Sequence, residues 1–153
     1  MQTSISSQSA STIRYSALFI GLFFLLLGLA GFMPAFVSYR TNPTEVAGFG
    51  YLFGLFPTNY FHNAIGILVG LWGIAASTSL SGAIVFDRIF AIIYAVVAIL
   101  GLFPATNNFF GMTPLYGNNI WLNALTAGVA FYFGFMKSVE SDLSTPSSPQ
   151  PSV

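Results

Sequence analysis

The chain has 153 residues, of which 55% are hydrophobic and only 5% are charged. Soluble domains carry roughly a quarter charged residues, so the composition excludes an ordinary soluble domain and predicts a protein that lies in lipid. Four basic and four acidic residues cancel, so charge gives no support for a nucleic-acid partner. The absence of cysteine excludes disulfides, thiolate metal sites and cysteine nucleophiles.

In the first third of the chain, the sequence predicts a disordered tail, a transmembrane span and an outer loop. Residues 1–12 are rich in Ser and Gln without apolar periodicity, so we expect a disordered tail. Residues 15–33 are uncharged and longer than the apolar core of a signal peptide, which favours a retained transmembrane span. The outer loop that follows begins polar and ends in an aromatic segment expected at the membrane interface: Phe49, Tyr51, Phe53 and Phe56.

Three further apolar segments complete the predicted membrane domain, residues 13–137. Spans are expected at residues 60–76, 88–103 and 119–136, and residues 138–153 read as a second disordered tail. The predicted fold class is therefore an all-α integral membrane protein with four transmembrane helices.

Basic residues set the expected orientation. Arg14, Arg88 and Lys137 flank the spans on one side, and only Arg40 lies on the other. Because basic residues concentrate on the cytoplasmic side, both termini are predicted to be cytoplasmic in a multi-pass topology.

Short motifs recur in the two halves of the chain. Gly101-Leu102-Phe103-Pro104 repeats Gly54-Leu55-Phe56-Pro57, and the first span ends in the related Gly31-Phe32-Met33-Pro34. The pattern Asn-x-x-x-Asn-Ala begins at Asn59 and again at Asn119. These motifs predict two helical-hairpin repeats related by a pseudo-two-fold axis along the membrane normal.

One face of the predicted helix 60–76 is small and polar. Its members recur at steps of three or four, which places them together on a helix: Asn59, His62, Asn63, Gly66 and Gly70. Such a face is expected to pack against other helices, while the opposite face, on which we place Ile67, meets lipid. Together with Asn119 and Asn123, these asparagines are expected to cap helices and bridge spans.

The stretch from Leu52 to Asn63, LFGLFPTNYFHN, resembles the hallmark of the domain of unknown function 4383 family. The similarity covers about residues 14–137. The resemblance implies a bacterial membrane protein with four spans, located in the bacterial inner (or internal) membrane. The family has no assigned activity. Histidines found in that family at two further positions are replaced here by Gly66 and Leu122.

His62 is the single histidine and the sharpest candidate for chemistry. Near a helix start, a neutral imidazole could ligate a pigment metal or haem iron. It could equally donate or accept a hydrogen bond that ties two hairpins together. Both interpretations remain open from the sequence.

The acidic residues argue against transport and catalysis. No carboxylate lies within a predicted span, and Asp87-Arg88 is interpreted as an interfacial pair, which disfavours a proton pump or ion-coupled transporter. No two-His metal spacing and no catalytic trio occurs. We therefore expect neither an enzyme nor a metal site.

Three functions follow from these patterns. The first is a non-catalytic accessory or interaction subunit, with the lipid bilayer and a larger membrane complex or a homo-oligomer as partners, and with no cofactor. The second is a binder of a hydrophobic cofactor, a pigment or quinone near His62. The third is a small channel or transporter between the two repeats.

Overall fold

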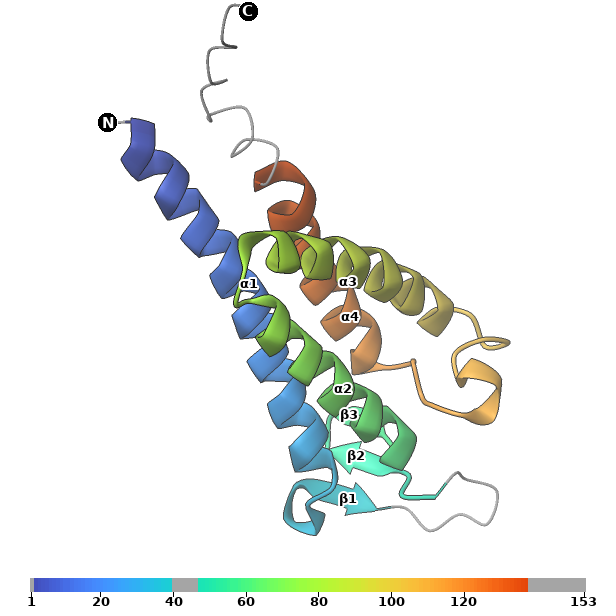
Figure 1. Cartoon of the computed structure of the whole chain (residues 1–153). Coiled ribbons are helices and arrows are strands. Elements are labelled where there is room, and N and C mark those ends of the chain that lie inside the picture. Colours follow the sequence, from blue (N-terminus) through green and yellow to red (C-terminus); the bar gives the residue numbers. More distant parts are fainter. Residues whose placement is uncertain (1, 40–46, 138–153) are drawn as a thin grey trace, which may run out of the picture.

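Residues 2–39 and 47–137 are described here from a computed structural model (Figure 1). Helices dominate this part of the chain. In order they are α1 (Gln2–Gly31), α2 (Tyr60–Ala76), α3 (Leu80–Gly101) and α4 (Asn118–Phe131), which continues as the π-helix η3 (Tyr132–Lys137). Residues 32–39, 47–59 and 102–117 lie at one end of the helices, and the α2–α3 turn lies at the other (Figure 1). Consecutive helices therefore run in opposite directions.

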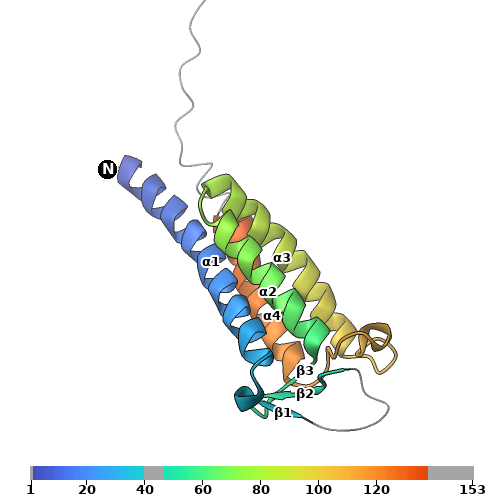
Figure 2. The same cartoon turned by 60° about the horizontal axis from the view of Figure 1, so that its bottom comes forward.

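The helices lie side by side in one bundle (Figure 2). The closest packing joins α1 to α2 and α3 to α4, so the chain forms two helical hairpins. Aromatic side chains fill the centre. Phe24 of α1 meets Phe90 and Tyr94 of α3 edge to face, with ring centroids 5.3 and 5.0 Å apart, and Phe90 stacks on Tyr94. These contacts join the two hairpins.

Two helices in the described part of the chain are long and apolar enough to cross a membrane: Ser7–Gly31 within α1, and α3. Helix α2 is also apolar but shorter. Large apolar side chains point outward along all four helices, for example Phe19, Leu68, Ile92 and Leu125. An apolar exterior around a bundle of this kind suits lipid contact.

Helices α1 and α2 approach each other through glycines. A Cβ added to Gly70 would lie 2.5 Å from the Leu25 backbone nitrogen, and one added to Gly66 would lie 3.3 Å from the Gly28 Cα. On α1, Gly28 in turn has no room for a side chain, because the Asn63 carbonyl and Ile67 occupy that space. Our placement of Ile67 towards lipid is therefore wrong, since it is half-buried against α1.

A small antiparallel sheet follows α1, which the sequence did not predict. Its strands are β1 (Val37–Tyr39), β2 (Gly50–Leu52) and β3 (Phe56–Thr58), in the order β1-β2-β3. The predicted interfacial aromatic segment forms β2, β3 and their turn. Gly54 has a positive φ of 71° there, which glycine adopts without strain. Pro57 lies on the edge strand β3, where its missing N–H is tolerated.

Two predicted boundaries were wrong. The segment predicted as the disordered tail 1–12 continues α1 back to Gln2. The Ser11 and Thr12 hydroxyls donate to carbonyls four residues earlier, and Ile13 is buried in the core cluster. The third helix starts at Leu80, well before the predicted 88. Ser79 caps it by accepting a hydrogen bond from the Gly82 N–H. Arg40, the polar loop and the predicted tail 138–153 lie outside the described residues.

The longer α3 places Asp87 inside a candidate membrane helix. The prediction that no carboxylate lies within an apolar helix of spanning length is therefore wrong, whereas the interfacial position of Asp87 beside Arg88 stays a prediction. Asp87 is fully buried. The Ser16 hydroxyl of α1 faces its carboxyl, but neither side chain makes a hydrogen bond of normal geometry within the described chain. Arg88 instead donates to the Gly134 carbonyl, at 2.7 Å.

Candidate functional site

Asn59 fixes the start of α2. Its Oδ1 accepts a hydrogen bond from the His62 backbone N–H at 2.8 Å, which caps the helix. Its Nδ2 donates to the Met112 carbonyl at 2.8 Å. The capping residue therefore also holds the loop that precedes α4.

Asn63 joins α2 to the end of α1. Its Nδ2 donates to the Gly31 carbonyl at 2.7 Å, and its Oδ1 accepts from the Thr58 hydroxyl. Gly31 must lack a side chain, because a Cβ there would collide with the Asn63 carboxamide. The carboxamide of Asn63 is thus used at both its donor and its acceptor.

Asn119 joins the start of α4 to the neighbouring loops, as Asn63 joins α2 to α1. Its Nδ2 donates to the carbonyls of Pro57 in β3 and Pro114 in the preceding loop, at 2.7 and 3.0 Å. The neighbouring Asn118 donates to the Leu55 carbonyl at 3.1 Å. The sheet and the 102–117 loop are therefore tied together above the bundle by side-chain amides.

His62 lies one turn inside α2, beside this network. Its Nδ1 is 3.0 Å from the Thr113 hydroxyl, and the Pro114 carbonyl also interacts with the ring. These partners come from the loop between α3 and α4. The imidazole therefore links the first hairpin to the second.

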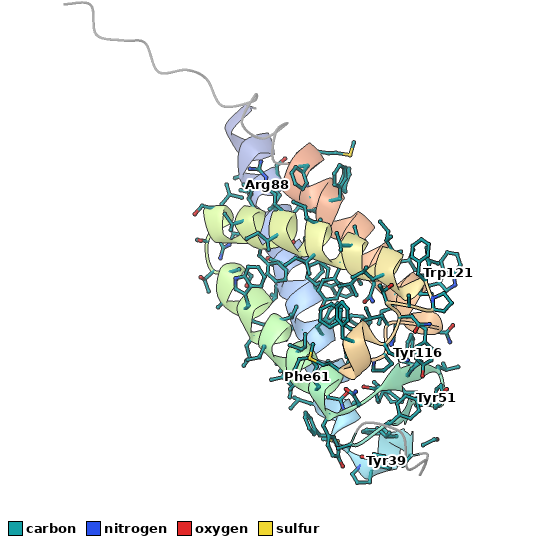
Figure 3. The ribbon with its side chains drawn as sticks, turned by 90° about the vertical axis from the view of Figure 1, so that its right-hand side faces the viewer. Tyr39, Tyr51, Phe61, Arg88, Tyr116 and Trp121 are labelled. Carbon is teal, nitrogen blue, oxygen red and sulfur yellow. The ribbon has the colours of Figure 1, made fainter. Side chains whose placement is uncertain are left out.

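A cavity of about 270 Å³ opens beside His62, between α2 and α3. Its volume is near the lower end of small-molecule sites, roughly 300–1,000 Å³. Apolar and aromatic side chains form most of its wall, among them Phe24, Val69, Trp72, Phe90, Tyr94 and Val97. Phe61 and Ile65 of α2 and Ile93 of α3 also line it and are exposed on the outer surface, so the cavity opens to the side of the bundle. Figure 3 shows Phe61 at the loop end of α2.

Asn123 is the unusual polar residue of this cavity. It lines both the main cavity and a smaller one that meets it at His62. Only 4% of its surface is exposed, yet its carboxamide makes no hydrogen bond within the described residues. Asn63 holds the matching position of the first Asn-x-x-x-Asn motif and is fully bonded. The two halves of the chain therefore differ at this point.

The predicted site residues divide into three groups. Asn59, Asn63 and Asn119 hold the loops, and His62 and Asn123 reach the cavity. Gly66 lines the cavity as well as contacting α1, whereas Gly70 serves the α1–α2 contact alone.

Of the residues that line the cavity, sequence reasoning singled out only His62, Gly66 and Asn123, and it missed among others Trp72, Tyr94 and Thr113. Thr113 could not have been assigned, because its partner is 51 residues away in sequence. In the sequence, Trp72 and Tyr94 are ordinary residues of two apolar helices, and only the fold brings them to the same cavity.

Over residues 2–39 and 47–137, no group of three or more His, Cys, Asp or Glu side chains could hold a metal ion. None of the described residues that line the cavity is an acid, a lysine or an arginine. The site can therefore offer hydrogen bonds, aromatic surface and one imidazole.

A family model described as Domain of unknown function (DUF4383) matches residues 14–136. Comparison with curated proteins and with solved structures gave no match. The matched range includes all four helices from Arg14 onward, both connecting segments and every residue of the cavity.

Proposed function

Because the chain belongs to the family described as Domain of unknown function (DUF4383), which names no activity, we propose a function from the geometry at His62. The protein is a non-catalytic, multi-pass integral membrane protein of a bacterial membrane. It binds one hydrophobic molecule, a quinone or pigment, in the cavity between α2 and α3. In this role it serves as an accessory subunit that holds its ligand within a larger membrane complex or a homo-oligomer.

Asn123 is the observation that carries this proposal. The carboxamide of Asn123 faces the cavity and is not enclosed by protein atoms. A carboxamide that the protein leaves without a partner bonds to water or to a ligand, and with neither it would cost about 1–3 kcal/mol. This carboxamide lines a mostly apolar cavity that is open towards the surface expected to meet lipid. A bound molecule with one polar group would satisfy Asn123, and its apolar part would cover the aromatic wall.

The four-span topology is part of the same proposal. The helices alternate in direction, so if α1 and α3 cross the membrane, α2 and α4 return across it. Arg14 donates to the Ser77 carbonyl at the α2–α3 turn, Arg88 donates to Gly134, and Lys137 ends η3. All three cations gather at the end opposite the sheet. By the positive-inside rule, this end is cytoplasmic.

The repeat remains a proposal as well. Gly31 ends α1 and Gly101 ends α3, and each is followed by two amides that donate to carbonyls three residues earlier. These equivalent helix ends support two hairpin units. The motif copy at Gly54 lies instead in the turn of the sheet.

Native mass spectrometry of the full chain, released from mild-detergent micelles, tests the proposal. We expect a population that carries a single small apolar molecule, which organic extraction then identifies. His62→Leu together with Asn123→Leu should abolish this adduct. If the wild-type protein stays free of ligand even after incubation with total bacterial lipid extract, the proposal is wrong.

A further inference from the structure

We infer that the molecule held at His62 and Asn123 is a quinone: a single flat, neutral ring with carbonyl oxygens and an apolar chain. This inference rests on the proposed function and narrows its ligand to one chemical class. Three properties of the cavity lead to it, namely its charge, its hydrogen-bonding groups and its shape.

The cavity favours an uncharged ligand. Its described lining contains no lysine, arginine, aspartate or glutamate. A phosphate, carboxylate or ammonium group would lose its hydration there without gaining a counter-charge, which is strongly unfavourable. Phospholipid head groups and free fatty-acid carboxylates are therefore poor occupants of the inner part of the site.

The unpartnered polar groups favour a ligand that accepts hydrogen bonds. The Asn123 carboxamide and the Tyr94 hydroxyl both line the cavity, and neither makes a hydrogen bond in the described part of the chain. The carboxamide NH2 and the phenolic O–H can both donate, and the oxygen of each group can also accept. A quinone carries only acceptor oxygens, so its carbonyls complement donors of this kind.

The shape selects one ring. Phe90 and Tyr94 stack at 4.0 Å between centroids, with planes 11° apart, and Trp72 and Phe24 add further aromatic surface. Flat rings pack well against such walls. A volume of about 270 Å³ accommodates a single ring with the start of a chain, whereas the four pyrrole rings of a tetrapyrrole pigment need more space. The chain of the quinone leaves between Ile65 and Ile93, towards lipid.

The two tryptophans of the chain supply a direct test, since quinones quench tryptophan fluorescence at short range. Trp72 lines the cavity, whereas Trp121 projects from α4 at the edge of the molecule and is 70% exposed (Figure 3). In the full chain with Trp121→Phe, the remaining Trp72 lines the cavity and is also 39% exposed, so it reports on the cavity and, in part, on the micelle. Trp72→Phe is the matched control, in which only the exposed Trp121 remains. Each purified variant is titrated in detergent micelles with a benzoquinone that carries a ten-carbon alkyl chain.

In the Trp121→Phe protein, we expect quenching with a component that saturates at one quinone per chain, above the weak linear quenching of the exposed part of Trp72. In the Trp72→Phe protein, only the weak, linear quenching by quinone dissolved in the micelle should remain. Adding Asn123→Leu to the first variant should raise the half-saturating quinone concentration about tenfold, the loss of one well-made hydrogen bond. Tyr94→Phe, which removes only a hydroxyl, should raise it severalfold. Asn108→Leu changes an exposed amide that makes no capping hydrogen bond and lies outside the cavity, so it should leave the titration unchanged.

Linear quenching that is equal in both single-tryptophan proteins would overturn the assignment of a quinone. Saturable quenching that neither Asn123→Leu nor Tyr94→Phe weakens would overturn the assignment of the binding groups. Extraction separates these failures from failure of the proposed function. A different neutral lipid released from the wild-type chain would leave a binding protein with another ligand, and a chain free of ligand would remove both proposals.

Discussion

The imidazole Nδ1 of His62 on α2 lies 3.0 Å from the hydroxyl of Thr113, in the loop between α3 and α4. Thr113 and His62 both line the cavity. The contact therefore has two effects: it joins the two hairpins, and it fixes the orientation of the ring at the site. A structural tie and a ligand-facing residue, which the sequence treats as alternatives, are compatible in one side chain.

A double-mutant cycle measures this contact. His62→Leu leaves the Thr113 hydroxyl without its partner and should lower the free energy of unfolding by about 1–3 kcal/mol. His62→Gln keeps a donor and an acceptor, so it should lower the free energy of unfolding by less than about 1 kcal/mol. The double variant His62→Leu/Thr113→Val should lose less free energy of unfolding than the two single variants lose together. The measurement is unfolding of the full chain in mixed detergent micelles, and strict additivity would contradict a direct interaction.

Three glycines form a graded series for helix packing. Gly70 faces the α1 backbone most closely, Gly66 has slightly more room, and Gly128 of α4 has no neighbour within 4 Å of an added Cβ. Gly70→Ala should therefore destabilise the protein by about 1–3 kcal/mol, as overpacking does. Gly66→Ala should destabilise the protein less than Gly70→Ala does. Gly128→Ala should be neutral or stabilising, by up to about 1 kcal/mol, because alanine is the better helix former. Equal melting temperatures for all three variants would exclude the close α1–α2 contact.

We predict that replacing Asp87 with asparagine does not destabilise the protein. The buried carboxyl makes no hydrogen bond in the described chain, and a carboxylate without a partner is costly in a low-dielectric interior. Asp87→Asn keeps the shape and cannot carry charge, so thermal stability in detergent at pH 8 should be unchanged or higher. A loss of more than about 1 kcal/mol would instead show that the charge of Asp87 has a stabilising partner.

Cysteine labelling tests the membrane topology, and the chain has no native cysteine to interfere. Ser79 lies at the α2–α3 turn, and Phe110, 83% exposed, lies in the 102–117 loop at the opposite end. With four spans, Ser79→Cys should react only when the cytoplasmic face is accessible. Phe110→Cys should react in intact spheroplasts with a reagent that does not cross the membrane. Reaction of both positions from one side would rule out the four-span arrangement.

The sequence predicts the helical part of this fold well, because an apolar segment of sufficient length has few alternatives to a helix in lipid. The helix α2, residues Tyr60–Ala76, has the bounds predicted from Pro57, Asn59 and the apolar run. The start of α3 was missed because Ser79 is a capping residue within a segment interpreted as a loop. The sheet was missed because its three short strands are stabilised by pairing between residues such as Tyr51 and Pro57, which no local pattern reveals.

The candidate site was predictable only in part. His62 and the four asparagines stood out because polar residues are rare in apolar helices. Their different roles depend on long-range partners, such as the Gly31 carbonyl for Asn63 and the Pro57 carbonyl for Asn119. The same motif gave no reason to distinguish Asn123 from Asn63, because the difference arises from the cavity between the two hairpins.

The central claim is that the cavity binds a small hydrophobic molecule, and two adjacent valines test it most directly. Val97 lines the cavity, whereas Val96, its neighbour on α3, points to the outer surface. Val97→Phe should fill the space that the ligand needs, and Val96→Phe makes the same chemical change outside it. The amount of bound molecule per chain is measured by organic extraction and mass spectrometry of each purified protein. We predict close to one molecule in the wild type and in Val96→Phe, and almost none in Val97→Phe. Equal amounts in the two variants would contradict binding in this cavity.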